Sequence, residues 1–157
     1  MKDLDTDIRI RQATTADGRM IAGLINSLVA ELNGVAATPP SAELIDCTMR
    51  MLNLRGAVWG FVAEHDGAPI GAVMVNECAG VRAGGLYGEI TELFVMPDHR
   101  SCGVATRLIA AVRALGRERE WSRLEVGPTP TKAWEKTHRL FAHAGFEESG
   151  PRMKLTL

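Results

Sequence analysis

The segment 89–108 contains residues whose types and spacing suit the binding of an anion. It reads as a strand, a turn at Pro97, a loop that contains Gly103, and then a long amphipathic helix. The first turn of a helix has free N–H groups and the positive end of the helix dipole, so a phosphate can bind there. Gly103 would let the backbone approach an anion closely, Ala105 keeps the next turn small, and Arg100 adds positive charge. The spacing predicts an anion site, and the alternative is a tight turn into a core helix.

Other patterns for nucleotides and metals are missing from the sequence. Neither Gly-x-x-x-x-Gly-Lys nor Gly-x-Gly-x-x-Gly occurs, which argues against a P-loop and against a dinucleotide-binding fold. The three cysteines, Cys47, Cys78 and Cys102, form no Cys-x-x-Cys pair. We therefore expect no structural zinc site and no other metal.

The elements that must position this segment follow from hydrophobic periodicity. Strands are predicted over 8–13, 57–64, 69–76, 89–96 and 124–126, and a last strand contains Met153, Leu155 and Leu157. Helices are predicted after Thr14, after Ser41, from Gly103 and over 131–144. The stretch 76–88 contains four glycines and is predicted to be a loop. The order β-α-α-β-β-β-α-β-α-β-β predicts an α/β (α+β) fold, with a mixed, mostly antiparallel six- to seven-stranded sheet flanked by about four helices.

Length and charge limit the classes of function. With 157 residues the chain is expected to form a single domain, 1–157, that buries its own core. The net charge of −1 argues against nucleic acid as the main partner. The N-terminus is too polar for a signal peptide, the apolar runs are too short to span a membrane, and an odd number of cysteines suits a reducing compartment. We expect a soluble, cytoplasmic protein.

Two motifs give the sequence a resemblance to the GCN5-related N-acetyltransferase (GNAT) superfamily. The first is Leu93–Pro97 followed by Arg100–Ala105, similar to the family's Leu-x-Val-x-Pro strand end and its Arg/Gln-x-x-Gly-x-Gly/Ala helix start. The second is Leu140–Phe146, similar to the family's C-terminal helix that ends in an aromatic residue and Gly-Phe. The resemblance covers nearly the whole chain and implies an acetyltransferase that uses acetyl-CoA as co-substrate.

The resemblance implies a binding site for acetyl-CoA. The pyrophosphate would lie on the loop before the helix, and the pantetheine arm would run beside the strand end, where a backbone N–H near Val95 would meet the thioester carbonyl. The strands that contain Val95 and Leu124 would splay apart to admit the arm. The residues implied to bind the co-substrate are Phe94, Val95, Arg100, Ser101, Cys102, Gly103, Val104, Ala105, Thr106 and Phe141.

The resemblance also points to a general base, because the acceptor amine must lose a proton. Glu89 matches the base of the family's histone-acetylating members, and Glu92 matches a glutamate of many other members. Strand alternation predicts that Glu89 shares a face with Thr91, Leu93 and Val95, and that Glu92 points to the opposite face. Glu125 is a third candidate. The alternative is that these glutamates are surface charges.

Two positions depart from the family pattern. Phe141 stands where the family often has a tyrosine that is thought to protonate the leaving thiolate, and Phe cannot do so. Tyr87 or His138 could supply the proton instead, although a thiol leaves fairly well as the anion. The stretch 127–130 (GPTP) replaces a frequent asparagine, which puts polar contacts to the pantetheine arm in doubt.

The sequence is compatible with three functions. The first is transfer of an acetyl group to an amine of a small molecule or a protein, with the two early helices and the stretch 76–88 shaping the acceptor pocket. The second is a non-catalytic acyl-CoA sensor on the same fold, which Phe141 favours. The third is a toxin that acetylates aminoacyl-tRNA, against which the near-zero charge counts. The resemblance also suggests a homodimer that pairs through the final strands.

Overall fold

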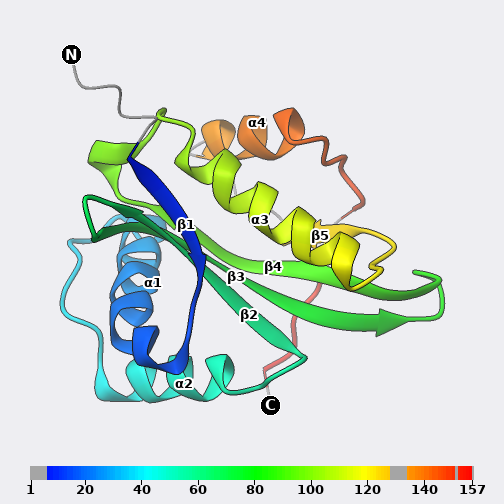
Figure 1. Cartoon of the computed structure of the whole chain (residues 1–157), viewed down its shortest axis with the longest axis horizontal. Helices are drawn as coiled ribbons and strands as arrows, with labels where there is room; N and C mark the ends of the chain where they lie inside the picture. Colours follow the sequence, from blue (N-terminus) through cyan, green and yellow to red (C-terminus); the bar gives the residue numbers. More distant parts are fainter. Residues whose placement is uncertain (1–6, 128–133, 151, 157) are drawn as a thin grey trace.

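The computed structural model describes residues 7–127, 134–150 and 152–156. Their elements follow the chain in an order that Figure 1 shows from blue to red. They are β1 (Ile8–Gln12), η1 (Thr15–Asp17), α1 (Gly18–Leu32), α2 (Ala42–Leu52), β2 (Val58–His65), β3 (Ala68–Gly80), β4 (Gly85–Val95), η2 (Pro97–His99), α3 (Val104–Glu118), β5 (Leu124–Val126) and α4 (Glu135–His143).

The strands form one five-stranded sheet in the order β1-β2-β3-β4-β5. The first four strands pair antiparallel, whereas β5 pairs parallel with β4 after the crossover through α3. In Figure 1, α1 and α2 cover one face of the sheet and α3 and α4 cover the other. The mixed sheet between two helical layers confirms the predicted fold class.

Each face of the sheet has its own core. The α3-side core contains Ile8, Ala63, Ile70, Val73, Val75, Ile90, Val95, Val104, Leu108, Ile109, Val112 and Phe141. The α1-side core contains Ile21, Leu24, Val62, Ala72, Met74 and Phe94. The apolar positions of α3 recur at helical spacing, which is why this helix could be predicted from the sequence.

The stretch 76–88 is mostly strand, so its prediction as a loop is wrong. β3 runs on to Gly80, β4 begins at Gly85, and Cys78 pairs with Tyr87 across the hairpin. Gly84 and Gly85 have φ values of 76° and 135°, which favour glycine, so these residues form a tight turn. Gly80 and Gly85 therefore end the two strands of a long hairpin, and Gly88 lies within β4.

The C-terminal segment departs from the predicted strands. Residues 152–156 form no strand, Met153 is fully exposed, and Leu155 is 85% exposed. Leu157 lies outside the described residues, as do residues 131–133 of the predicted last helix. The sheet therefore has five strands within the described part of the chain, where six to seven were predicted. Alternating apolar residues mark a segment that could pair, but β5, at three residues, offers little edge to pair with.

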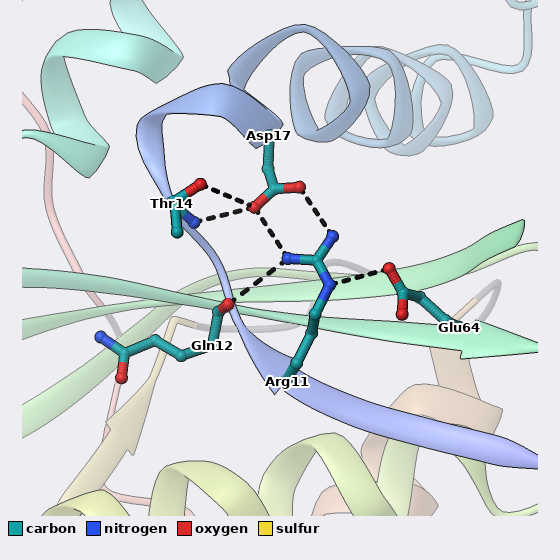
Figure 2. A network of polar contacts seen from close by, with 5 residues as sticks. All are labelled: Arg11, Gln12, Thr14, Asp17 and Glu64. Carbon is teal, nitrogen blue, oxygen red and sulfur yellow. Dashed lines mark hydrogen bonds and ion pairs between the residues drawn. The ribbon is translucent and has the colours of Figure 1, made fainter. Parts of the chain in front are cut away.

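An ion-pair network fixes the start of the first helical region against the sheet. Figure 2 shows the Arg11 guanidinium donating to both carboxylate oxygens of Asp17, at 2.9 and 2.7 Å, and through Nε to Glu64 at 2.8 Å. Asp17 also accepts a bond of 2.8 Å from the backbone N–H of Thr14, as a capping residue does. The bond from Arg11 lowers the pKa of Asp17, and those from Asp17 and Glu64 raise the pKa of Arg11. β1, β2 and η1 are thereby joined.

Among the described residues, no helix is both long enough and apolar enough to cross a bilayer.

Candidate functional site

Strand β4 carries a bulge at Thr91. Glu92 pairs with Met74 and Ile90 pairs with Val75, so Thr91 has no partner of its own on β3. An extra residue in one strand reverses the alternation of the side chains that follow it.

The packing on the two sides of the bulge records this reversal. Ile90 and Leu93 both pack in the α3-side core although they are three positions apart, and Phe94 packs in the α1-side core. Glu89 and Glu92 consequently lie on the same face of the sheet, the one that α1 and α2 cover. The prediction that the two glutamates point to opposite faces is wrong, as is the grouping of Glu89 with Leu93 and Val95, which both pack in the α3-side core.

Glu92 is half-buried on this face. Its carboxylate accepts a bond of 2.5 Å from the Thr91 hydroxyl. Burial raises the pKa of Glu92 above its ordinary value of 4.5, and the charge of Glu89 adds to the rise of this pKa. Glu92 therefore keeps a higher proton affinity than an exposed glutamate.

Glu89 lies in a cluster of charged groups. It pairs in register with Glu125 on β5, and the Arg152 guanidinium contacts both carboxylates, Glu125 at 3.4 Å. The Cys78 thiol lies 3.9 Å from Glu89 Oε2, and burial followed by the charge of Glu89 raises the pKa of that thiol. Glu125 also pairs with Arg123 at 2.7 Å. No motif in the sequence indicated that Arg152, which lies 63 residues beyond Glu89, would contact this glutamate.

The candidate proton donors lie in different surroundings. Tyr87 is half-buried, with the Arg123 guanidinium 5.3 Å from its ring centre, and the neighbouring Cys78 raises the pKa of its hydroxyl. His138 is on the surface of α4 and lies 3.0 Å from Glu148. Phe141 is 6% exposed and packs edge-to-face with Phe146. Only Tyr87 shares the face of Glu89, because strand alternation places residues 87 and 89 together.

Strands β4 and β5 part after a short contact. β5 pairs only with Gly88, Glu89 and Ile90, whereas β4 continues to Val95. The N–H of Met96 donates to Ile70 of β3 at 2.8 Å, so the N–H and C=O of Val95 turn away from β3, toward the open side of the strand. This edge of β4 can pair with an extended ligand.

The loop after β4 ends at a helix N-terminus without a side-chain cap. Ser101 has a φ of 63° and Gly103 a φ of 76°, which turns the chain sharply into α3. Gly103 O accepts from the N–H of Arg107, so the N–H groups of residues 104–106 precede the hydrogen-bonded ladder of the helix. The first turn contains no acidic residue. Val104 points into the core, Ala105 is half-buried, and Thr106 is exposed.

Arg100 is not placed as a free cation at this N-terminus. Its guanidinium makes a bidentate pair with Glu31 of α1, at 2.9 and 2.7 Å, and its Nε donates to Val95 O at 2.9 Å. The guanidinium also lies 5.4 Å from the ring centre of Phe94. Cys102 contacts the carbonyl of Arg100 through Sγ at 3.5 Å. The structure thus gives Arg100 a role in holding the loop against β4 and α1, which its spacing did not reveal.

A cleft of about 1200 Å³ lies between β5, α4 and the segment after α4. Glu125, Arg152 and Phe141 line it, so it reaches the charged cluster beside Glu89. Three further cations lie along it: Arg82, Arg113 and Arg123. Neither Glu92 nor the α3 N-terminus is among its lining residues, so the cleft adjoins the predicted site from the β5 side.

The family model described as "Acetyltransferase (GNAT) family" matches residues 23–146. No curated protein matches the sequence significantly.

Several solved structures share the fold. A ribosomal-protein-alanine N-acetyltransferase from Brucella melitensis biovar Abortus 2308 is 21% identical with a TM-score of 0.75, and the match covers 96% of this chain and 99% of that one. An aminoglycoside acetyltransferase from an uncultured soil metagenomic sample, in complex with sisomicin, is 18% identical with a TM-score of 0.77, covering 98% and 99%. An aminoglycoside N-acetyltransferase in complex with CoA is 20% identical with a TM-score of 0.75, covering 96% and 94%. At these identities the likeness establishes the fold alone.

Proposed function

The chain belongs to the acetyltransferase (GNAT) family, and we propose that it transfers an acetyl group from acetyl-CoA to a primary amine of a small molecule or a protein. In this reaction a C–N bond forms, the C–S bond of the thioester breaks, the amine loses a proton, and CoA leaves as the thiol. The observation that supports this proposal is that three features lie together on β4 or directly after it. They are an uncapped helix N-terminus, an open strand edge and two glutamates on one face.

The residues present fit acetyl-CoA. The N–H groups of residues 104–106 and the positive end of α3 suit a pyrophosphate, since no side chain caps the helix and no carboxylate lies in its first turn. The open edge at Phe94 and Val95 suits the pantetheine arm, and the Val95 N–H suits the carbonyl oxygen that becomes negative during transfer. We assign Ser101, Cys102 and Gly103 to the loop that surrounds the pyrophosphate, Arg100 to holding that loop, and Phe141 to the wall behind the arm.

We assign the general base to Glu92 ahead of Glu89. The lone pairs of Glu89 are engaged by Arg152 and by the Cys78 thiol, so taking a proton there would break existing contacts. Glu92 has one hydrogen bond, from Thr91, and its pKa is raised by burial, which brings the carboxylate closer to a useful base at neutral pH. The carboxylates of Glu89 and Glu125 then give a negative charge to the part of the site that binds the acceptor amine.

We assign the proton donor to Tyr87. Phe141 has no acidic proton, and His138 is paired with Glu148 at the helix surface. The raised pKa of Tyr87 keeps its hydroxyl protonated at neutral pH, so it can deliver a proton to a leaving thiolate.

We further propose that residues 1–157 act as one domain in a reducing cytoplasm, where the three free cysteines would remain thiols. The alternating exposed Met153 and Leu155 support a homodimer in which residues 152–156 pair with a second copy.

The test is release of CoA thiol from acetyl-CoA against a panel of amines, for the wild type, Glu92→Gln and Glu89→Gln. Glu118→Gln on the exposed end of α3 is the matched control. We expect release with some amines, a large loss in Glu92→Gln at unchanged acetyl-CoA affinity, and no change in the control. Tight acetyl-CoA binding without release against any amine would instead support the acyl-CoA sensor. Loss only in Glu89→Gln would move the base to Glu89.

A further inference from the structure

A bidentate ion pair joins the segment before the α3 loop to the C-terminal end of α1. The terminal guanidinium nitrogens of Arg100 donate to the two carboxylate oxygens of Glu31, at 2.9 and 2.7 Å. Arginine makes the same fork-shaped contact with carboxylates and with phosphates. In the free protein, Glu31 therefore occupies the side of the Arg100 guanidinium that could otherwise face a phosphate.

The position of Glu31 in α1 is unfavourable for the helix itself. α1 ends at Leu32, so Glu31 lies in the last turn, and no basic residue lies in that turn. The carbonyl end of a helix has a partial negative charge, which repels a carboxylate. The side chain of Glu31 is 43% exposed, so it does not fill the core either. Within the part of the chain that the structure describes, the contact with Arg100 compensates for this repulsion.

Arg100 is held beside β4 by other contacts as well. Its Nε donates to Val95 O at 2.9 Å, and its guanidinium lies 5.4 Å from the ring centre of Phe94. Val95 and Phe94 are both buried. The two side chains of the ion pair are themselves largely open to solvent, and ion pairs of this kind contribute little to stability. Loss of the Glu31 charge should therefore leave Arg100 in place with an uncompensated positive charge.

That charge lies close to the loop that we assign to the pyrophosphate of CoA. Gly103, which begins the uncapped N-terminus of α3, is three positions after Arg100. Three residues of chain span at most about 10 Å, and the positive φ values of Ser101 and Gly103 turn this stretch sharply. Charges within such a distance still interact at low ionic strength, because the Debye length is about 10 Å at 0.1 M salt. An unpaired Arg100 would attract the pyrophosphate, and the Glu31 carboxylate opposes this attraction.

Resting on the function proposed above, we propose that Glu31 is a positioning residue that limits the affinity of the site for CoA by engaging the charge of Arg100. Acetyl-CoA and CoA contain the same pyrophosphate, so Glu31 acts on the substrate and on the product alike. It would thereby reduce the occupancy of the site by product CoA. No local pattern predicted this role, because Glu31 lies 69 positions before Arg100 in the sequence.

The test is calorimetric titration of CoA into the full chain at low and at high ionic strength. We expect Glu31→Gln to bind CoA about threefold or more tightly than the wild type at low ionic strength, and this gain to vanish at high ionic strength. Glu31→Asp keeps a carboxylate near Arg100 and should bind nearly as the wild type does. Glu118→Gln, which removes the same charge at the exposed end of α3, is the matched control. In an Arg100→Gln background, Glu31→Gln should have no further effect.

The remaining outcomes separate this proposal from the proposed function. A wild type that does not bind CoA would overturn both. If the wild type binds CoA and Glu31→Gln binds it equally or more weakly, only the role of Glu31 is overturned, and a lower melting temperature of Glu31→Gln would then indicate a structural role. An equal gain in the Arg100→Gln background would also overturn it, because Glu31 would then repel the phosphates without acting through Arg100.

Discussion

At Thr91 two residues of β4 lie opposite one position of β3, and this irregularity brings Glu89 and Glu92 to one face. The two glutamates nevertheless differ in their surroundings. Arg152 and Cys78 engage Glu89, whereas burial raises the pKa of Glu92. Similar side chains on one strand can therefore take different tasks, and each can be tested separately.

The pH dependence of activity should report on Glu92. A base must be ionised to accept a proton, so kcat/KM of the wild type should fall as the pH drops through a pKa above the ordinary 4.5. Glu92→Gln should lower kcat by about 10²- to 10⁴-fold, the usual contribution of a general base, and should lose this acidic limb. Steady-state rates over a pH series would check both. If kcat/KM of Glu92→Gln still fell at low pH as it does in the wild type, the fall would belong to another group.

The hydroxyl of Tyr87 should matter less than the base. Because a thiolate leaves fairly readily without help, we expect Tyr87→Phe to lower kcat about tenfold, a modest effect for a proton donor. The KM for acetyl-CoA should not change. Wild-type kcat in Tyr87→Phe would show that the thiolate leaves unprotonated.

Elements depend on contacts between residues far apart in the sequence. Arg11 joins β1 to η1 and to β2 through Asp17 and Glu64, and Arg100 joins the loop before α3 to Glu31 of α1. The apolar stripe of α3 was predictable from its period. These ion pairs were not, because no local pattern states which distant carboxylate an arginine will meet. The bulge was unpredictable for a related reason, since it depends on the register with β3.

Removing Arg11 should destabilise the fold. Arg11→Met leaves the part-buried carboxylate of Asp17 without its partner, and we expect a loss of about 1.5–3 kcal/mol in the free energy of unfolding, as for hydrogen bonds to charged groups. Arg9→Met, exposed on the same strand, should cost much less. Denaturant unfolding measures both, and equal effects would mean that the network contributes nothing specific.

The same network predicts a dependence of stability on pH. Arg11 lowers the pKa of Asp17, so the contribution of this carboxylate is complete above the ordinary value of 3.8 and is lost as the pH falls through the lowered pKa of the folded state. The difference in unfolding free energy between the wild type and Asp17→Asn should therefore be constant near pH 7 and should shrink below pH 3.8. A difference that grows on acidification would contradict the assignment.

At the scale of the whole molecule, the order of elements followed from hydrophobic periodicity, and the two motifs identified the family. Which segment forms the edge of the sheet could not be predicted from hydrophobic periodicity. Met153 and Leu155 alternate as a strand should, yet they are exposed in a segment that forms no strand. Alternation predicts that a segment can pair, but only the available partner decides whether it does.

That exposed segment should mediate pairing of two copies. We expect light scattering to give the mass of a dimer for the wild type and of a monomer for the double variant Met153→Lys, Leu155→Lys, because charges on an edge segment oppose strand pairing. Lys154→Gln is the control within the same segment. A monomeric wild type would contradict the proposed homodimer.

The affinity of acetyl-CoA for the wild type, Thr106→Glu and Thr106→Gln tests directly whether the N-terminus of α3 binds the pyrophosphate. Thr106 is exposed in the first turn of α3, where a carboxylate stabilises the helix but repels a pyrophosphate. We predict measurable binding to the wild type, at least tenfold weaker binding to Thr106→Glu with an unchanged or higher melting temperature, and nearly wild-type binding to Thr106→Gln. Failure of the wild type to bind, or equal affinity in all three proteins, would contradict this prediction.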